Sequence, residues 1–293
     1  PDKVKNSLEV KVDRLGRIIQ DTGTGGSWPC SSDRVVWALS AWNIYLATGD
    51  MDWLQKAYDI IGRSLEADFV VVYNPQTGLF RGESSFIDWR EQSYPVWAQP
   101  ADIYMSECLG TNAAYYGVLK VMEDMATVLG KKKDVKKYGQ KAEALKKAIN
   151  DNFWVEEDGY YASYLYGRQN LTRTQQSETL GESFCVLFGI ADEERAAKVI
   201  SSMPVGEFGP PIFSPQIVSQ PDYHNNGVWP YVTSFWGKAA AKAITCNSML
   251  SSRPSLVAAF ISRIDSFALN ESFRLKGFKT VALLIIFLQK KKK

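Results

Sequence analysis

Two kinds of long segment alternate along this chain, and their alternation limits the possible folds more than any other feature. Segments of the first kind are apolar on nearly every face, which is typical of helices surrounded by protein; they cover residues 35–47, 112–129, 179–190 and 228–244. Segments of the second kind carry apolar residues on one stripe at helical spacing; they cover residues 53–65, 134–153 and 195–203. Repeated about four times, a buried helix followed by an amphipathic one predicts an all-α, two-layer ring of helical hairpins.

Polar and glycine residues mark the helix ends and the connections between hairpins. Gly49-Asp50 ends the first apolar segment and offers an N-cap for the next helix, and Asp192 offers one for the segment at 195–203. Aromatic, turn-rich connections separate the hairpins; they are residues 73–106, 158–166 and 204–226. We expect the second connection to form a short β-hairpin, and all three to line the rims of one cleft.

The alternation stops after about Ser251. Residues 281–288 are an apolar run of eight, too short for a bilayer span, which needs about 20 residues. Four lysines follow at 290–293. A membrane-surface anchor and a cloning or frame-shift tail both fit this end. We therefore predict one domain over residues 1–250, which forms an incomplete ring, and an atypical C-terminal tail over residues 251–293.

Charge and cysteine usage exclude several partners and cofactors. The net charge is +2, and the lysine-rich stretches at 131–147 and 290–293 are not interleaved with aromatic residues, so nothing favours nucleic acid as a partner. The four cysteines are far apart and form no Cys-x-x-Cys pair, which predicts neither a zinc site nor a disulfide framework; they are Cys30, Cys108, Cys185 and Cys246. We expect no metal and no other cofactor.

The start of the chain leaves the cellular compartment open. Residues 1–20 are charged and lack the apolar core of a signal peptide. The first residue is not Met, so we expect a fragment or a processed form. A bacterial periplasmic location and a cytoplasmic one both fit.

One connection, residues 78–97, concentrates the residue types that a sugar site needs. It holds two glycines, three carboxylates, two arginines and two tryptophans between helical segments. A carboxylic acid flanked by aromatic rings can keep its proton in a partly dry pocket, and the rings offer flat apolar faces to a sugar. The alternative is an ordinary surface loop, with tryptophans that fill the core and acids that are solvated.

The same connection carries one of two motifs with a known counterpart: Gly78-Leu79, Gly82 and Phe86-Ile87-Asp88-Trp89. The other motif is Tyr-His-Asn-Asn-Gly-Val-Trp-Pro at residues 223–230. Both resemble motifs of the six-hairpin (α/α toroid) glycosidases, most closely the amylo-α-1,6-glucosidase module of glycogen-debranching-type proteins. Those proteins carry Gly-Leu…Gly…Thr-Trp-Met-Asp and, with one Asn fewer, Tyr-His-Asn-Gly-x-Val-Trp-Pro. The resemblance implies an (α/α)6-type toroid with small β-hairpin excursions at the cleft.

A third match is looser. Ser27-Trp28-Pro29 followed by Asp33-Arg34 is similar to an early Trp-Pro…Arg-Asp segment that binds the terminal sugar, with Asp and Arg in the reverse order. Together the three matches cover about residues 20–245. The α-L-rhamnosidase-like six-hairpin group also resembles the Phe-Ile-Asp-Trp region and the hairpin after it, so the identity of the sugar stays open.

The resemblance implies an inverting glycoside hydrolase that acts on an α-linked glucan or oligosaccharide, or an α-L-rhamnosidase-like hydrolase. Asp88 takes the place of the general acid. Burial among neighbouring aromatic rings is expected to raise the pKa of Asp88, so that it keeps its proton near neutral pH. Glu83 and Glu91 are the fallback acids.

The general base of that family is a glutamate beyond the Val-Trp-Pro helix. After Glu207 the carboxylates of this chain are Asp222, Asp265 and Glu271, and the last two lie in the atypical tail. We therefore expect the base to lie outside this chain, and we expect essentially no turnover by the chain alone.

The resemblance and the polar residues of the connections also predict contacts to the carbohydrate substrate. The predicted binding residues are Trp28, Asp33, Arg34, Trp89, Arg90, Glu182, Tyr223, His224, Asn225 and Trp229. Structural alternatives stay open, since the tryptophans can fill the core, and Glu178 and Glu182 can stabilise a helix start. His224 is the only histidine, which confines Ser-His-Asp or Cys-His chemistry to that position; we expect it to face sugar hydroxyls.

Three other functions compete with hydrolysis. A non-catalytic carbohydrate-binding or degenerate glycosidase module would keep the pocket and lack the base. Another α/α toroid, such as a terpene cyclase or a prenyltransferase, needs acid-rich Mg²⁺ clusters or a Cys/His zinc site, and the sequence has neither pattern. A helical-repeat scaffold would not need the long aromatic connections.

Overall fold

The structure, a computed structural model, describes residues 1–19, 28–84, 94–217 and 222–246. The backbone alone is described at residues 223, 224 and 244–246. Within these ranges the chain is mainly helical, with short strands between the helices. The predicted all-α class with small β excursions is confirmed.

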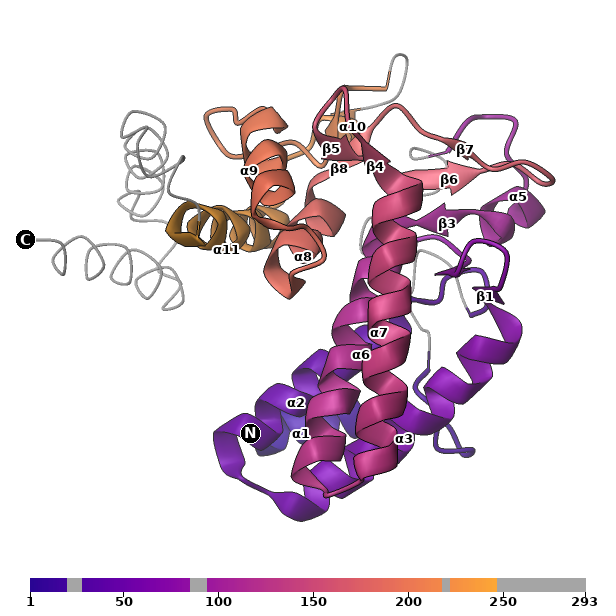
Figure 1. The fold of residues 1–293 in the computed structure, drawn as a ribbon, viewed down its shortest axis with the longest axis vertical. Coiled ribbons are helices and arrows are strands. Elements are labelled where there is room, and N and C mark those ends of the chain that lie inside the picture. The colour runs from indigo at the N-terminus through magenta and orange to yellow at the C-terminus, as the bar shows by residue number, and fades with distance from the viewer. Residues whose placement is uncertain (20–27, 85–93, 218–221, 247–293) are drawn as a thin grey trace, which may run out of the picture.

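Three helical hairpins and one further long helix make up most of the described chain (Figure 1). The hairpins are α2 (Trp37–Thr48) with α3 (Met51–Val71), α6 (Leu109–Val128) with α7 (Lys132–Phe153), and α8 (Thr179–Phe188) with α9 (Glu193–Ser202). The further long helix is α11 (Pro230–Cys246). Shorter helices are α1 (Asp2–Glu9), η1 (Asp33–Val36), α5 (Pro100–Met105) and α10 (Asp222–Asn225).

Two hairpin turns are set by the caps that the sequence predicts. α2 is capped by Gly49, whose φ of 67° is left-handed, a conformation that glycine adopts without strain. Asp50 accepts a hydrogen bond from the N–H of Trp53 at 2.9 Å, and Asp192 accepts one from the N–H of Arg195 at 2.8 Å. Each carboxylate satisfies an N–H group that the first turn of the helix leaves without a partner.

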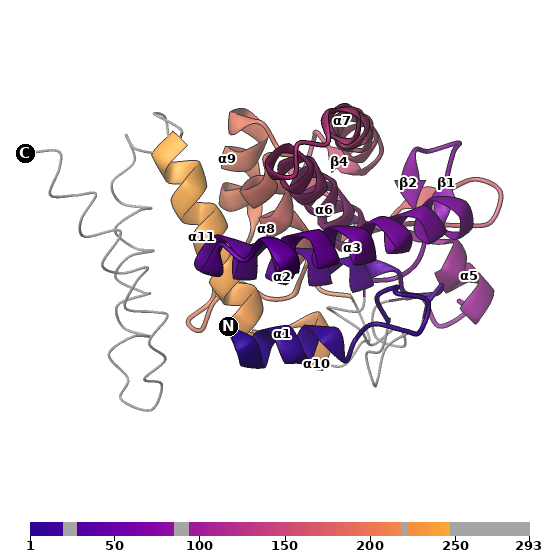
Figure 2. The same cartoon turned by 90° about the horizontal axis from the view of Figure 1, so that it is seen from below.

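α6 lies at the centre of the helical core (Figure 2). It packs against α2, α3, α7, α8 and η1, and most of its residues are buried. Tyr115 of α6 stacks on Phe80, with ring centroids 3.7 Å apart. One continuous core joins residues of all three hairpins and of α11. The inner position predicted for the second apolar segment is therefore confirmed.

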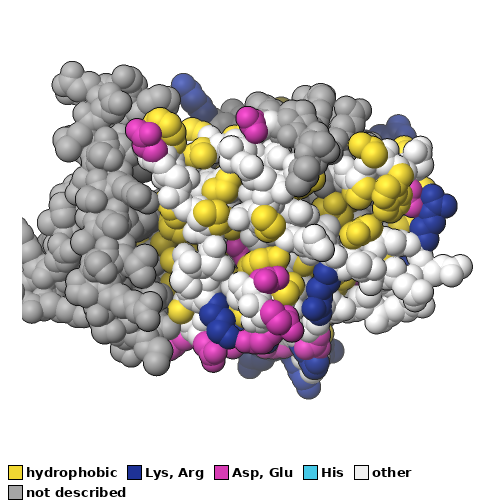
Figure 3. Space-filling model, turned by 90° about the horizontal axis from the view of Figure 1, so that it is seen from above, with side chains coloured by type: hydrophobic (Ala, Val, Ile, Leu, Met, Phe, Trp, Pro, Cys, Tyr) yellow, Lys and Arg dark blue, Asp and Glu magenta, His cyan; other side chains and the backbone are white. Residues whose placement is uncertain are grey.

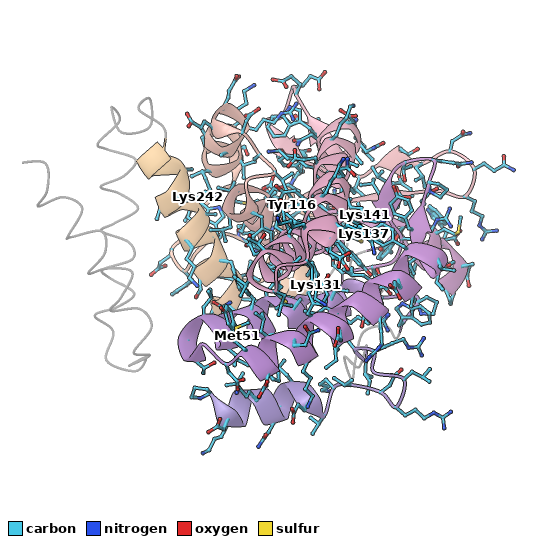
Figure 4. All side chains as sticks on the ribbon, turned by 60° about the horizontal axis from the view of Figure 1, so that its bottom comes forward. Met51, Tyr116, Lys131, Lys137, Lys141 and Lys242 are labelled. Atoms are coloured by element: carbon cyan, nitrogen blue, oxygen red, sulfur yellow. The ribbon has the colours of Figure 1, made fainter. Side chains whose placement is uncertain are left out.

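α7 is an outer helix, as its single apolar stripe predicts. The predicted stripe is buried; it consists of Tyr138, Ala142, Leu145 and Ile149. Lysines of this helix and its N-cap lie over aromatic rings of α3 (Figure 4): Lys131 Nζ is 4.7 Å from the centre of the Tyr58 ring, and Lys141 Nζ is 3.3 Å from that of Phe69. The lysine stems thus cover aromatic surface between α3 and α7.

α2 differs from its prediction. Its sequence predicts a helix with protein on every side, yet Leu46 is 61% exposed, and Ser40, Asn43 and Ala47 are exposed as well. The buried side of α2 faces α3 and α6, and among the described residues it also contacts the short α1. An apolar helix face makes burial favourable, but it does not determine which other element packs against that face. The first inner helix is therefore open on one side.

Short strands connect the helices, and most of them gather at one end of the hairpins (Figure 1). The two-stranded sheets are β1 (Tyr73–Asn74) with β2 (Leu79–Phe80), β4 (Trp154–Val155) with β5 (Tyr160–Tyr161), and β8 (Ser177–Glu178) with β9 (Phe213–Ser214). The remaining sheet has three strands in the order β3 (Glu107–Cys108), β6 (Tyr164–Tyr166), β7 (Thr172–Arg173). The hairpin predicted within residues 158–166 is wrong in its pairing, because β5 pairs back to β4 whereas β6 pairs with β3 and β7.

The tail predicted at 251–293 lies outside the described residues. Across the ranges that the structure does describe, no helix is long and apolar enough to cross a bilayer. The division into a domain over 1–250 and a tail stays a prediction.

Candidate functional site

The inner helices begin at one common rim. α6 starts directly after β3, and α8 starts directly after β8. A Cβ on Gly181 would lie 2.9 Å from the backbone N of Gly110, so the first turns of these two helices are in contact. η1, which leads into α2, packs on α6. The N–H of Thr179 donates to the carbonyl of Ile212 at 2.9 Å, which ties the connection before α11 to the start of α8.

Buried carboxyl groups gather at this rim. Six acidic residues are 2% exposed or less: Asp33, Asp68, Glu83, Glu107, Glu178 and Glu182. Carboxylates are rarely buried, because removal from water disfavours the charged form. Such a set at the ends of secondary-structure elements is typical of a functional site. Within the described ranges, no group of three or more acidic, cysteine or histidine side chains is arranged to hold a metal ion.

Glu178 lies between the first turns of α6 and α8. A Cβ on Gly181 would come within 2.1 Å of Glu178 Oε1, and a Cβ on Gly110 within 2.5 Å, so glycine at both positions leaves room for the carboxyl group. Burial, the largest effect, and the negative charge of Asp33 together raise the pKa of Glu178 to about 8. The N–H groups of the two glycines lower the pKa in part, but neither carboxyl oxygen makes a hydrogen bond of regular geometry to a described residue. Glu178 is therefore mainly protonated at neutral pH.

Glu182 stands one turn further along α8. Its Oε1 accepts a hydrogen bond from the N–H of Tyr161 at 3.0 Å, whereas its Oε2 has no partner among the described residues. Burial raises the pKa of Glu182 well above its ordinary value, and the neighbouring Glu178 raises it further. Glu182 is 0% exposed, and its role in substrate binding stays a prediction.

Glu83 and Ser84 fix the chain to the rim immediately before residue 85. Oε1 of Glu83 accepts a hydrogen bond from Ser31 Oγ at 2.8 Å, and its backbone carbonyl accepts one from Thr111 Oγ1 at 3.1 Å. Ser84 Oγ accepts a hydrogen bond from the N–H of Thr111 at 2.9 Å. Thr111 belongs to the first turn of α6, so this segment is held at the start of the central helix.

The predicted acid and two predicted binding residues lie outside the described residues: Asp88, Trp89 and Arg90. The chain on both sides of them is held at the start of α6. Before the segment, Ser84 accepts a hydrogen bond from Thr111 in the first turn of α6. On the other side, the hydroxyl of Tyr94 lies 2.7 Å from Ser106 Oγ and 3.3 Å from Cys108 Sγ, directly before that helix. The catalytic role of Asp88 stays a prediction.

Trp28 and Arg34, two predicted binding residues, belong to a buried ion-pair network. Arg34 Nη2 lies 2.7 Å from Asp68 Oδ1, and Nη1 donates to the carbonyl of Ile18 at 2.9 Å. The indole N–H of Trp28 donates to Asp68 at 2.8 Å, and the guanidinium of Arg34 lies 4.9 Å from the centre of the Trp28 ring. Much of the hydrogen-bonding capacity of these side chains is used inside the protein. Asp33 beside them is 1% exposed.

The second motif is described only in part. The side chains of Tyr223 and His224 lie outside the described residues. Asn225 is buried: its Oδ1 accepts a hydrogen bond from the N–H of Ile217 at 2.6 Å, and its Nδ2 donates to the carbonyl of Ile217 at 2.8 Å. Trp229 is half-buried beside β9. Asn225 therefore fixes the connection before α11, and Trp229 lies at the same rim as Glu178.

A repeated pentapeptide could have located two of the buried acids. Ser-Glu-x-Leu-Gly occurs at residues 106–110 and again at 177–181, each time at the start of an inner helix. Glu107 was not among the residues predicted from the sequence, because the two copies of this pentapeptide were not recognised as related. The sequence signal for both buried glutamates is an acid directly before a long apolar segment, because the start of an inner helix is surrounded by protein.

Helical hairpins whose inner helices begin at one common rim are the architecture of an α/α toroid domain. Residues 21–205, more than half of the chain, match the family model described as the bacterial alpha-L-rhamnosidase 6 hairpin glycosidase domain. The chain therefore belongs to this family of six-hairpin glycosidase domains. None of the curated proteins matches it.

Two solved structures are similar in fold. A GH78 family rhamnosidase of Bacillus sp. GL1 has a TM-score of 0.52 at 19% identity, over 78% of this chain and 22% of that chain. A rhamnosidase from Klebsiella oxytoca with rhamnose bound has a TM-score of 0.55 at 15% identity, over 89% of this chain and 46% of that chain. The chain spans less than half the length of either structure. At these identities the likeness establishes the fold alone.

The predicted membership of the six-hairpin glycosidases is confirmed. Of the two subgroups that the motifs resemble, the family match belongs to the bacterial α-L-rhamnosidases. Nothing in the comparisons supports the glycogen-debranching subgroup.

Proposed function

We propose that the parent protein is a glycoside hydrolase that acts on α-L-rhamnosides. The match to a glycosidase family over residues 21–205 supports the reaction class, and two similar structures are named as rhamnosidases. The observation that carries the proposal is the rim of buried carboxyl groups beside the fixed ends of the segment that holds Asp88. An α-linked glucan, favoured by the motifs alone, is the alternative substrate.

Asp88 is the proposed general acid. It follows Ser84 by four residues, so the length of the chain keeps its Cα within about 14 Å of the Cα of Ser84. A general acid must keep its proton near neutral pH, and a rim that desolvates carboxyl groups favours this. Asp88 would protonate the leaving oxygen while a carboxylate on the other face of the sugar activates water.

An inverting mechanism needs an ionised base about 6.5–9.5 Å from the acid. Burial raises the pKa values of Glu178 and Glu182, which disfavours the ionised form that a base needs. Because the resemblance implies a glutamate beyond the Val-Trp-Pro helix as the base, we place the base outside this chain and expect the chain alone to turn over essentially nothing. On its own it would act as a non-catalytic carbohydrate-binding module.

Hydrolysis of aryl α-L-rhamnosides, aryl α-glucosides and isomaltose-type oligosaccharides by the parent protein tests the proposal. Asp88→Asn should lower kcat on the rhamnoside by about 10²–10⁴ without a change in fold. Glu143→Gln, at an exposed position of α7, is the matched control and should keep full activity. Turnover of glucosides but not of rhamnosides would refute the proposed substrate. Full activity of Asp88→Asn would refute the assigned acid.

A further inference from the structure

Exposed aromatic side chains next to the rim have no role in the site described so far. Trp97 is 55% exposed and Val96 is 92% exposed, and Tyr166 is half-buried. The ring centroids of Trp97 and Tyr166 lie 6.1 Å apart, with their planes at 42°. Hydrophobic side chains gather at this end of the molecule, over α5 and the β6–β7 region (Figure 3). Clustered exposed apolar side chains mark binding surfaces.

One carboxylate joins the two segments that carry these rings. Arg168, two residues after Tyr166, binds Asp102 of α5 through Nε at 2.6 Å and through Nη2 at 3.1 Å. Asp102 also accepts a hydrogen bond from the N–H of Gln99 at 2.9 Å, two residues after Trp97. These contacts hold the two segments that carry the rings together without a ligand, which lowers the entropy that binding must overcome.

Tyr94 connects this surface to the acid rim. Its ring centroid lies 4.5 Å from that of Tyr164 in β6. Its hydroxyl contacts Ser106 and Cys108. Cys108 belongs to β3 directly beside Glu107, and burial, with a smaller contribution from the carboxyl group of Glu178, raises its pKa to about 12. The packing beneath the aromatic surface thus extends to the candidate site through the buried Tyr94 and Cys108.

We propose that Trp97 and Tyr166 form a stacking platform for a pyranose unit of the carbohydrate beyond the unit that is cleaved. This proposal rests on the proposed glycosidase function. A pyranose ring has a face of C–H groups that packs flat on an aromatic ring, and Trp97 offers the larger exposed face. Because the platform lies at the outer edge of the rim, it contacts the part of the carbohydrate that extends away from the site. Arg168 Nη1 makes no hydrogen bond to a described residue and can donate to a sugar hydroxyl.

Affinity electrophoresis in gels that contain a soluble polysaccharide with terminal α-L-rhamnose tests the platform. The chain should be retarded. Trp97→Ala should weaken binding about tenfold and Tyr166→Ala about threefold, as expected for the loss of single aromatic contacts. Trp97→Phe keeps an aromatic face and should retain most of the binding. Leu46→Ala, which removes a 61% exposed apolar side chain at the far end of α2, is the matched control and should bind like the unmodified chain.

Equal retardation of Trp97→Ala and the unmodified chain overturns the platform. No retardation of the unmodified chain overturns it as well, and then favours packing of these rings against another part of the parent protein. Trp97 is more than half exposed, so its removal should leave the circular dichroism spectrum unchanged. The hydrolase proposal is judged separately. Retardation that depends on Trp97, in a parent protein that cleaves no rhamnoside, keeps the platform and refutes the hydrolase.

Discussion

Glu107 and Glu178 occupy the same position in two copies of one sequence pattern, but their carboxyl groups have different hydrogen-bond donors around them. Each follows a serine and precedes x-Leu-Gly, at residues 106–110 and 177–181. Each stands where a short strand leads into an inner helix, and they are 0% and 1% exposed. The local sequence therefore determines that both carboxyl groups are buried.

The neighbouring hairpin determines what surrounds each carboxyl group. Glu107 faces the β1–β2 turn, where Asn74 Nδ2 donates to its Oε1 at 2.7 Å and Thr77 Oγ1 donates at 2.9 Å. Glu178 faces the backbone of Gly110 and has no side-chain donor among the described residues. Burial raises the pKa of both, but in Glu107 the two donors oppose the rise. One oxygen of Glu107 therefore has two side-chain donors while its Oε2 has no partner among the described residues, and neither oxygen of Glu178 has a side-chain donor there.

Glu178→Gln should have the largest effect on stability, and the effect should grow with pH. The folded-state pKa of about 8 lies above the ordinary value of 4.5, so between these pH values the folded chain holds a proton that the unfolded chain has lost. The free energy of unfolding therefore falls as pH rises through this window, by roughly 3–5 kcal/mol at most. Gln cannot ionise, so the variant should lack this fall and be the more stable protein at pH 8. Urea denaturation at pH 5 and pH 8 measures the difference.

Glu107→Gln is the matched control for that experiment. Its effect on the pH dependence should be smaller, because the Asn74 and Thr77 donors lower the pKa of Glu107 in part. Glu182 should keep some of the slope in the Glu178 variant, since its pKa is raised as well. Identical pH profiles for the two variants would show that the two glutamates do not differ.

Gly181→Ala should have the second largest effect on stability, because its Cβ would fill the space that the Glu178 carboxyl group occupies. The new Cβ would lie 2.1 Å from Glu178 Oε1 and 2.9 Å from the backbone N of Gly110. We expect a loss of about 2–3 kcal/mol in the free energy of unfolding, the usual range for overpacking. Gly237→Ala is the control, since a Cβ there meets nothing within 4 Å; in a helix it should stabilise by up to about 1 kcal/mol. If urea denaturation gave Gly181→Ala and Gly237→Ala the same stability, the Glu178 carboxyl group would be able to move away from the new Cβ without cost.

The inner and outer helices could be predicted, because the faces of a helix that are buried show in the spacing of its apolar residues. The alternation of apolar and amphipathic segments gave the inner and outer layers, and Asp50 and Asp192 gave two caps. The open face of α2 could not be predicted. An apolar side chain such as Leu46 indicates that burial is favourable, whereas its exposure depends on which elements lie beside it.

The candidate site could be predicted as a region but not as a set of contacts. Trp28 and Arg34 were predicted to lie at a sugar site, yet both bind Asp68, which is 40 and 34 positions away. Contacts over such distances depend on how hairpins pack, and no local pattern records them. Buried acids are harder still, because an acid is expected at the surface unless its neighbours are known. Asp33, Glu83 and Glu182 were named from the motifs and connections, whereas for Glu107 the repeated Ser-Glu-x-Leu-Gly was the available signal.

Thr77→Val should have the smallest effect, because it removes only one of the two side-chain donors that distinguish Glu107 from Glu178. Valine has the shape of threonine without the hydroxyl, so it removes the donor at 2.9 Å from Glu107 Oε1 and keeps the packing. It also removes the acceptor of a 3.3 Å hydrogen bond from the N–H of Leu79. We expect a loss of about 1 kcal/mol in the free energy of unfolding at neutral pH.

The pH dependence of that loss shows whether the Thr77 hydroxyl lowers the pKa of Glu107. With one donor fewer, the charged form is less favoured and the pKa of Glu107 rises further. The loss should therefore be larger at pH 8 than at pH 5, because only the ionised carboxylate needs the missing donor strongly. In the Glu107→Gln background, the pH-dependent part should vanish and a constant part should remain, since the amide oxygen loses the same donor. A loss that is equal at both pH values and in both backgrounds would show that Thr77 does not hold Glu107 ionised. The difference between the two glutamates would then have to arise from the Asn74 donor and the positive charge of Arg81.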